Sequence, residues 1–484
     1  MISLLSLPLA LLPTTILGWL VLRLLEWKKP VLFTAERWVM GCVLGSTLAM
    51  YLVFVANAFL AIPLTFWGFL ETFSIPLIIL GSLWLAISKR FPASPPPHTT
   101  LPLPPGTRII LGFLLLTVAI RIVITGMTFL LFIPSFFQDT LNNWNLRGKV
   151  FYETHTLTLI MPNEDPVLSP QAVSSYPPTV PLVKTWLALS AGEWSEPLIN
   201  SIHIVWYLGA LALLFFAIRR MASAGWALLG VYVLGSMPLY LMHGTNAYAD
   251  AFVSVHVFIA VSLTFFGLRA EDASARASFL RLAALGAGVL SFTKNEGLLI
   301  FLPPLLLITI LSLGRDALSH RMSWKESLRI GCWYILTLAL IAVPWLSFKW
   351  MHGLTFGNGK PFTSLGIGWQ KLVPTSIFVN TFFEGNWLLL FPLLFGLLVW
   401  RWRAAFGRLA PIVSFFLLIY VGQMLLYLFT KLSQEALMQT GYARGLVQLL
   451  PTICFIIILL LKDSAPVLGR GLRALAERTP FLRS

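Results

Sequence analysis

The chain has 484 residues, of which 57% are hydrophobic and 11% are charged, and its net charge is +15. A soluble domain carries about 25% charged residues, so this chain has too little polar surface to coat a water-soluble globule. Its Lys and Arg residues stand in short loops between apolar runs, which favours membrane topology over nucleic-acid binding as the reason for the positive charge.

The apolar runs predict an all-α polytopic membrane protein of about thirteen transmembrane helices, because about 20 apolar residues cross a hydrocarbon core of ~30 Å. The first run has no basic residue before it, so we expect a membrane helix there and not a cleaved signal peptide. The predicted spans are 3–25, 38–60, 64–87, 108–131, 199–218, 224–242, 247–268, 277–293, 296–314, 329–348, 385–400, 409–430 and 445–461.

The segment 88–107 (KRFPASPPPHTTLPLPPGTR) has seven prolines in twenty residues. Proline cannot donate a helical hydrogen bond, so we expect an extended cytoplasmic linker. This linker would separate a three-helix transmembrane prefix, 1–87, from a transmembrane core, 108–484. The core has polar segments at 132–198, 349–384 and 431–444, and such loops often carry function.

The distribution of Lys and Arg predicts the orientation. If the segment 132–198 is placed outside, the alternation of spans puts 24 of the 34 basic residues on the cytoplasmic side. We therefore predict a multi-pass protein of the plasma (inner) membrane, with the N-terminus outside, the C-terminus in the cytoplasm and the three polar segments on the outer face.

The first outer segment, FFQDTLNNWNLRGKVFYETHTL, begins with a carboxylate. Asp139 follows an apolar run directly, which places it at the outer membrane boundary. Trp144 and Lys149 follow on a short amphipathic stretch that we expect at the interface. A helix cap with interfacial anchors would explain these residues as well as a functional carboxylate does.

Two further stretches of the sequence carry candidate residues. In SSYPPTVPLVKTWLAL, Tyr176 precedes prolines that force an extended entry into a helix, and Lys184 lies just inside that helix. A rigid turn with a snorkelling lysine is the alternative. In MHGTNAYADAFVSV, His243 and Tyr248 precede Asp250 at the start of a span.

Asp250 is the second carboxylate on the predicted outer face, although it could also be a helix cap. Two carboxylates at one depth on separate helices can activate an acceptor, bind a divalent metal such as Mg²⁺ or Mn²⁺, or do both.

Basic residues complete the set. SFTKNEGLLIF places Lys294 and Glu296 at the outer end between two spans, where they could pair with each other or face lipid headgroups. TGYARGLVQLLP places Arg444 at the start of the last span, where it could bind phosphate or snorkel to the interface. The sequence has no nucleophile elbow, Walker loop, HExxH, CxxC or GxGxxG motif, which removes the enzyme classes that those motifs indicate.

Together these segments resemble the GT-C superfamily of integral-membrane glycosyltransferases, which use polyprenyl-phosphate sugars and include bacterial aminoarabinose transferases and protein O-mannosyltransferases. The resemblance covers roughly 108–461. Asp139 resembles the acidic residue that opens the family's long outer loop with its interfacial helices, although Thr140 follows it where the family more usually has a second acidic residue. Four later stretches resemble family motifs that occur in the same order, namely YPPTVPL, YAD with its Asp250, TKNEG and ARGLVQLLP.

The resemblance implies an inverting transfer of a sugar from a polyprenyl-phosphate donor to an acceptor at the outer face of the lipid bilayer. The acceptor could be a glycan, a lipid or a protein. Asp139 would be the base or a metal ligand, Asp250 would orient the acceptor or share the metal, and Arg444 and Lys294 would hold the donor phosphate. The expected substrate-binding residues are Trp144, Lys149, Tyr176, Lys184, His243, Tyr248 and Glu296.

Two other classes of protein remain open from sequence. A transporter or flippase of lipid-linked sugars would use the same outer residues for binding alone. A non-catalytic membrane scaffold would use the carboxylates only as caps, and Asp139 and Asp250 would then lie far apart. The glycosyltransferase hypothesis predicts that they converge on one outer cavity.

Overall fold

The computed structural model describes residues 2–90, 104–161, 173–356, 366–383, 385–438 and 440–478. The regular structure of these residues is helical, apart from one isolated β-bridge between Ile367 and Thr430. The first part of the chain forms α1 (Ile2–Leu25), α2 (Thr34–Leu60), α3 (Phe66–Arg90), α4 (Pro105–Met127), η1 (Thr128–Phe132), η2 (Thr140–Asn145), α5 (Leu146–Thr154), η3 (Val173–Ser175), α6 (Thr179–Ala191), α7 (Glu196–Arg219), α8 (Ala224–Ser236) and α9 (Pro238–Thr245).

The second part of the chain continues the helical bundle. It forms α10 (Asp250–Arg269), α11 (Ala273–Leu290), η4 (Gly297–Phe301), α12 (Leu302–Leu318), α13 (Trp324–Met351), α14 (Val373–Phe382), α15 (Leu390–Trp400), α16 (Trp402–Ala405), α17 (Ala410–Phe429), α18 (Ser433–Leu437) and α19 (Gly441–Arg478).

The all-α polytopic class is confirmed, but thirteen spans is too many. In the described ranges, eleven helices are long and apolar enough to cross a membrane, and a twelfth span is counted if α8 and α9 form one. The predicted span 224–242 is broken before Pro238, which cannot donate to α8, and the two helices meet at a bend of 75°. The predicted span 385–400 contains only the 11 residues of α15, which reach about 16 Å of a core that is ~30 Å thick.

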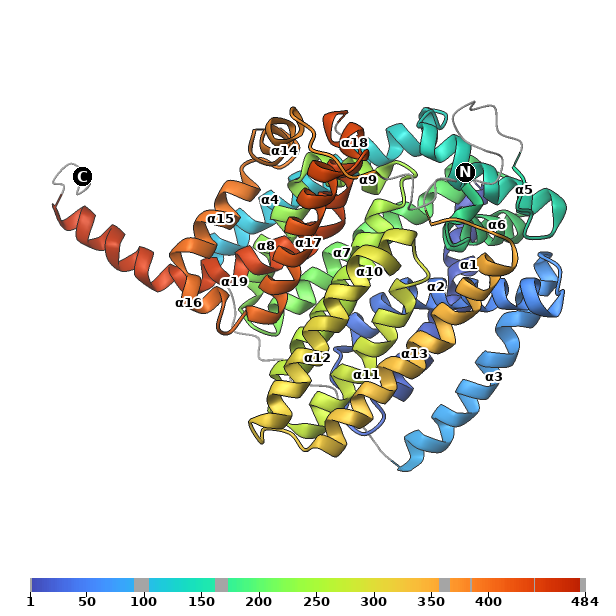
Figure 1. Ribbon diagram of the computed structural model, residues 1–484, viewed down its shortest axis with the longest axis horizontal. Helices are drawn as coiled ribbons and strands as arrows, with labels where there is room; N and C mark the ends of the chain where they lie inside the picture. Colours follow the sequence, from blue (N-terminus) through green and yellow to red (C-terminus); the bar gives the residue numbers. More distant parts are fainter. Residues whose placement is uncertain are drawn as a thin grey trace.

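The helices divide into a buried centre and a lipid-facing periphery (Figure 1). Nearly every residue of α10 is buried, and so is most of the apolar part of α19. The peripheral helix α4 instead exposes apolar side chains, among them Ile109, Ile110 and Phe113. Such outward apolar faces are what a lipid solvent requires.

The three-helix prefix packs directly on the core. Within the prefix, glycines let α1 and α2 approach closely, since a Cβ on Gly18 would lie 2.2 Å from the carbonyl oxygen of Gly41. Between prefix and core, the indole Nε1 of Trp186 donates to the Ala10 carbonyl over 2.8 Å, and Thr47 Oγ1 lies 2.9 Å from Nε2 of His256.

The non-helical linker predicted at 88–107 is shorter than expected, because a helix extends into it from each end. Helix α3 continues to Arg90, and α4 begins at Pro105, a position in the first turn where the missing N–H costs nothing. Residues 91–103 of the predicted linker lie outside the described residues.

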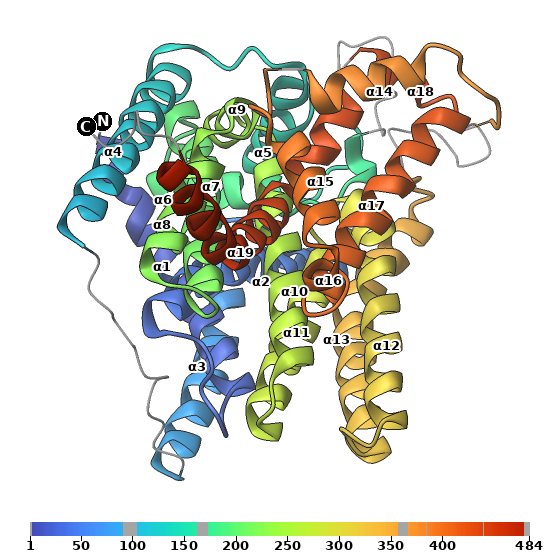
Figure 2. The ribbon, with the colours of Figure 1, turned by 90° about the vertical axis from the view of Figure 1, so that its left-hand side faces the viewer.

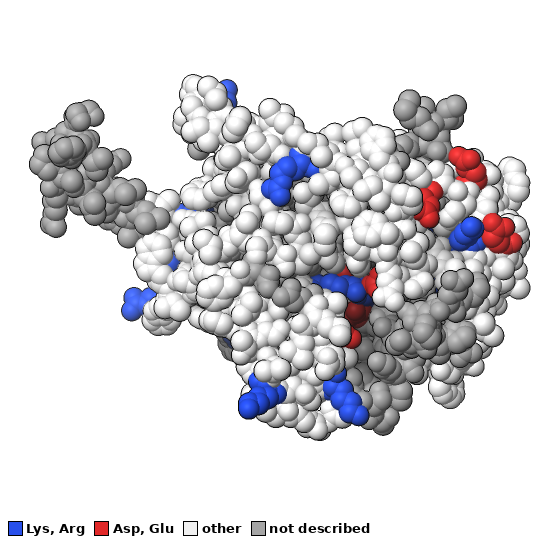
Figure 3. All heavy atoms as spheres, turned by 90° about the horizontal axis from the view of Figure 1, so that it is seen from above, with Lys and Arg blue, Asp and Glu red and all other residues white. Residues whose placement is uncertain are grey.

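The predicted outer segments gather at one end of the bundle. Figures 1 and 2 both place α5, α9, α14 and α18 in the upper part of the molecule. Figure 3 views this end from above and shows basic and acidic atoms meeting in a hollow near its middle, with a mostly uncharged surface around it. The side of the membrane on which this end lies stays a prediction.

Candidate functional site

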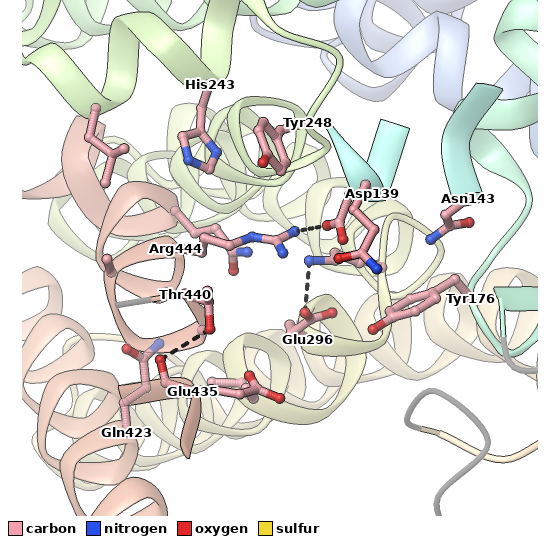
Figure 4. A pocket seen from close by; sticks show the side chains of 18 of the residues that line it. Asp139, Asn143, Tyr176, His243, Tyr248, Glu296, Gln423, Glu435, Thr440 and Arg444 are labelled. Carbon is pink, nitrogen blue, oxygen red and sulfur yellow. Dashed lines mark hydrogen bonds and ion pairs between the residues drawn. The ribbon is translucent and has the colours of Figure 1, made fainter. Parts of the chain in front are cut away.

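A polar cavity of about 480 Å³ lies among the upper ends of the helices (Figure 4). Eight of the eleven predicted site residues line it: Asp139, Trp144, Tyr176, His243, Tyr248, Lys294, Glu296 and Arg444. The other lining residues are Gln138, Asn143, Leu239, Met242, Ile300, Gln423, Leu426, Tyr427, Glu435, Thr440, Gly441, Ala443, Gly445 and Gln448. Residues that are hundreds of positions apart in sequence therefore meet at one place.

Asp250 is not among the lining residues of this cavity but contacts four side chains that are. Its side chain is fully buried as the first residue of α10. Oδ1 accepts from Nε2 of Gln448 over 2.6 Å and from Nζ of Lys294 over 3.3 Å. Oδ2 accepts from Nε of Arg444 over 2.8 Å and lies 3.1 Å from Nδ1 of His243. The Asp250 side chain does not cap its own helix, because both oxygens are engaged elsewhere.

Arg444 joins the two predicted carboxylates. It projects from the first turns of α19, and while its Nε contacts Asp250, its Nη2 lies 2.7 Å from Oδ2 of Asp139. Figure 4 shows the guanidinium pointing across the cavity toward Asp139. The guanidinium carbon lies 5.3 Å from the ring centroid of Tyr248, and the His243 ring stacks on Tyr248 at 4.6 Å. The wide separation expected of unrelated caps is therefore wrong.

Lys294 is the second cation at the cavity. Its Nζ lies 3.3 Å from Oδ1 of Asp250 and 2.8 Å from Oε1 of Glu296. Burial alone would lower the pKa of Lys294, but Asp250 and Glu296 together outweigh burial and raise this pKa above its ordinary value. Lys294 therefore stays protonated at neutral pH.

Several buried polar atoms around the cavity lack a hydrogen-bond partner within the described part of the chain. They are Asn143 Oδ1, Trp144 Nε1, Glu296 Oε2 and Gln423 Oε1. Buried polar atoms in folded proteins are nearly always paired, so these four are hydrogen-bonding groups that the described residues leave unused near the cavity. The rings of Trp144 and Tyr176, with centroids 5.8 Å apart, add an aromatic surface to the cavity lining.

The structure adds cavity residues that the sequence reasoning missed. Gln423 is an amide in the middle of the apolar run of α17, and a polar residue inside a span is itself a functional signal. Gln448 lies four residues after Arg444 and so faces the same side of α19. The sequence has no comparable signal for two other lining residues. These are Asn143, one residue before Trp144, and Glu435, in the predicted outer segment 431–444.

The two remaining predicted residues do not reach the cavity. Lys184 is fully buried below it, where Nζ donates to Oδ1 of Asn145 over 2.5 Å and to Oδ1 of Asn200 over 2.8 Å. A snorkelling position for Lys184 is therefore also wrong. Lys149 is exposed on α5 and borders a separate, mostly apolar hollow that it shares with Glu153. Helix α6 packs against η2, and the Lys184 side chain lies buried between them.

The described side chains around Asp139 and Asp250 do not support the predicted metal site. In the described ranges, His, Cys, Asp and Glu side chains form no group of three or more that could hold a metal ion. Asp139 and Asp250 are bridged by a guanidinium, which occupies the place where a shared cation would have to lie. A divalent ion stays a prediction, and no step below depends on one.

No family model matches this sequence, and no curated protein sequence matches it either. Among solved structures, the chain is similar to ArnT from Cupriavidus metallidurans bound to undecaprenyl phosphate, with a TM-score of 0.51 and 14% sequence identity. The match covers 76% of this chain and 63% of the ArnT chain. The apo structure of the same ArnT matches over the same shares with a TM-score of 0.49 and 14% identity. The expected resemblance in fold to the GT-C aminoarabinose transferases is thus confirmed.

Proposed function

We propose that this protein is a membrane glycosyltransferase that moves a sugar from a polyprenyl-phosphate donor to an acceptor hydroxyl. The observation that carries the proposal is the 2.7 Å contact between Asp139, a carboxylate suited to be a base, and Arg444, a cation suited to phosphate, in one polar cavity. The ArnT-like fold supports the same class of reaction.

Arg444 and Lys294 are the groups that hold the donor phosphate in this proposal. A guanidinium binds phosphate oxygens through two parallel hydrogen bonds, and a lysine adds a second positive charge. The phosphate gains negative charge as the bond to the sugar breaks, so cations fixed beside it favour the transition state over the bound substrate. Asp250 contacts both cations, and its role is to position them.

Asp139 is the proposed base. Its side chain is 37% exposed at the cavity, whereas that of Asp250 is fully buried, so only Asp139 is open to an acceptor. The acceptor hydroxyl gives its proton to Asp139 while its oxygen bonds to the anomeric carbon of the sugar. The bond from that carbon to the phosphate oxygen breaks, and the polyprenyl phosphate leaves with the electron pair. One displacement of this kind inverts the anomeric configuration.

The rest of the cavity suits the two chemical halves of such a donor. The amide side chains of Gln138, Asn143 and Gln448 line the cavity and suit sugar hydroxyls, and the aromatic rings of Trp144 and Tyr176 can pack on a sugar face. The apolar side chains of Met242, Ile300 and Leu426 line another part of the cavity and suit an isoprenyl chain.

The test measures transfer from a panel of radiolabelled polyprenyl-phosphate sugars by the purified protein. We expect Asp139→Asn to lower turnover by about 10²- to 10⁴-fold, the usual contribution of a general base. The matched control is Glu153→Gln, the same change at an exposed carboxylate outside the cavity, which should leave turnover unchanged.

Each outcome of this experiment decides something. Full transfer by Asp139→Asn would remove the proposed base. Donor binding without transfer across a broad acceptor panel would favour the transporter alternative, and neither binding nor transfer would favour a scaffold. Loss of transfer in EDTA, restored by Mg²⁺ or Mn²⁺, would establish a metal requirement that the present proposal does not include.

A further inference from the structure

Two anionic groups would bind the Arg444 guanidinium in this site. In the structure its Nη2 is paired with Asp139, and in the proposed reaction the same guanidinium binds the donor phosphate. Asp250 already takes the Nε edge, so a phosphate that binds through two parallel hydrogen bonds must use the outer edge, which includes Nη2. The phosphate and Asp139 would then compete for one nitrogen.

The surroundings of Asp139 and Asp250 show which of their contacts with Arg444 a phosphate can replace more easily. Asp250 is fully buried and has further contacts with Lys294, Gln448 and His243, so it cannot leave Arg444 without stranding a buried charge. Asp139 is 37% exposed, and within the described residues Arg444 is its one ion-pair partner. The Asp139 contact is therefore the weaker and the more easily replaced.

We propose that the donor phosphate displaces Asp139 from Arg444 and thereby frees Asp139 to act as the base. Once the phosphate occupies Arg444, Asp139 has lost its one ion-pair partner within the described residues, and its Oδ2 is open to accept a hydrogen bond from the acceptor hydroxyl. The acceptor hydroxyl would be deprotonated only after the donor is bound, which makes the order of substrate binding a property of the site.

This inference rests on the proposed function but can be tested without turnover. The probe is undecaprenyl phosphate in detergent micelles, and the measurement is its affinity for the purified full-length protein. We expect Asp139→Asn to bind this lipid about fivefold more tightly than wild type, since removing a partly exposed ion-pair partner releases Arg444. The same variant should lose transfer, so affinity and activity should move in opposite directions.

A double-mutant cycle separates displacement from simple charge repulsion. Arg444→Gln alone should weaken binding, and adding Asp139→Asn to it should give little or no further gain. An equal gain in both backgrounds would show that Asp139 only repels the phosphate, and this result would overturn the proposal. The Glu153→Gln control should bind as wild type does, and thermal unfolding should confirm that each variant is folded.

The two proposals fail in different ways. If wild type does not bind undecaprenyl phosphate at all, the donor class in the proposed function is wrong. If wild type binds it and Asp139→Asn gives no gain, only the displacement is wrong and Asp139 can still be the base.

Discussion

Asp139 and Asp250 contact the same guanidinium but differ in burial, and this difference predicts different effects on stability. A partly exposed ion pair contributes about 0.2–1 kcal/mol, whereas breaking a buried pair costs about 3–5 kcal/mol because a charge is left uncompensated. We therefore expect Asp250→Asn, which leaves Arg444 and Lys294 underneutralised, to lower the unfolding temperature much more than Asp139→Asn. Thermal unfolding of the purified protein in detergent measures this. Equal shifts would contradict a positioning role for Asp250.

At the same scale, the sequence indicates which charged residues gather around the cavity better than it indicates which contacts they make. Asp139, Asp250, Lys294 and Arg444 were found because charge at a membrane boundary is costly and therefore informative. Neither their contacts nor the burial of Asp250 could be predicted from sequence, since Arg444 and Asp250 are 194 positions apart and their contact depends on how α10 and α19 pack.

At the scale of elements, Lys184 links three helical segments. It projects from α6 and donates to Asn145 at the end of η2 and to Asn200 in α7, so it fixes the base of the segment that begins beside Asp139. Burial, only partly offset by Glu196, holds the pKa of Lys184 well below its ordinary value of 10.5. The amine is thus a structural donor whose protonation differs between the folded and unfolded chain.

This difference predicts a pH effect. Between the lowered folded pKa and 10.5, the unfolded chain binds more protons than the folded chain, so stability rises as pH rises. We expect the unfolding temperature of wild type to increase between pH 7 and pH 9, and Lys184→Met to show a smaller increase. Lys149→Met, at an exposed lysine of α5, is the control and should follow wild type. Identical pH profiles for wild type and Lys184→Met would mean that the buried amine stays charged.

The spans could be predicted where apolar length alone decides whether a helix crosses the membrane. The prediction was wrong where a helix break or a late helix start shortens an apolar run. Apolar length alone identifies most of the bundle, because the hydrocarbon core has one thickness. The run 224–242 is long enough, but Pro238 divides it, and the bend carries α9 and its His243 to the cavity. The run 385–400 contains enough apolar residues, but its helix begins only at Leu390.

At the scale of the whole molecule, the cavity end and the opposite end differ in the loops that they carry. The cavity end holds α5, α9, α14 and α18, whereas the described connections α7–α8, α10–α11 and α12–α13 at the opposite end are short. The alternation of helices places most of the Lys and Arg residues toward that opposite end, and cytoplasmic loops are the ones that collect basic residues. The cavity end is therefore predicted to face outward.

Cysteine accessibility tests this orientation directly. In a protein whose Cys42, Cys332 and Cys454 are replaced by Ala, a new thiol is introduced either as Thr154→Cys, at the cavity end, or as Glu271→Cys, in the loop between α10 and α11. Both positions are exposed, so a membrane-impermeant maleimide should reach either one from its own side. In sealed right-side-out membranes we expect Thr154→Cys to react at once and Glu271→Cys to react only after permeabilisation. The reverse pattern would turn the cavity toward the cytoplasm, and a lipid-linked donor would then have to reach Arg444 from the inner leaflet.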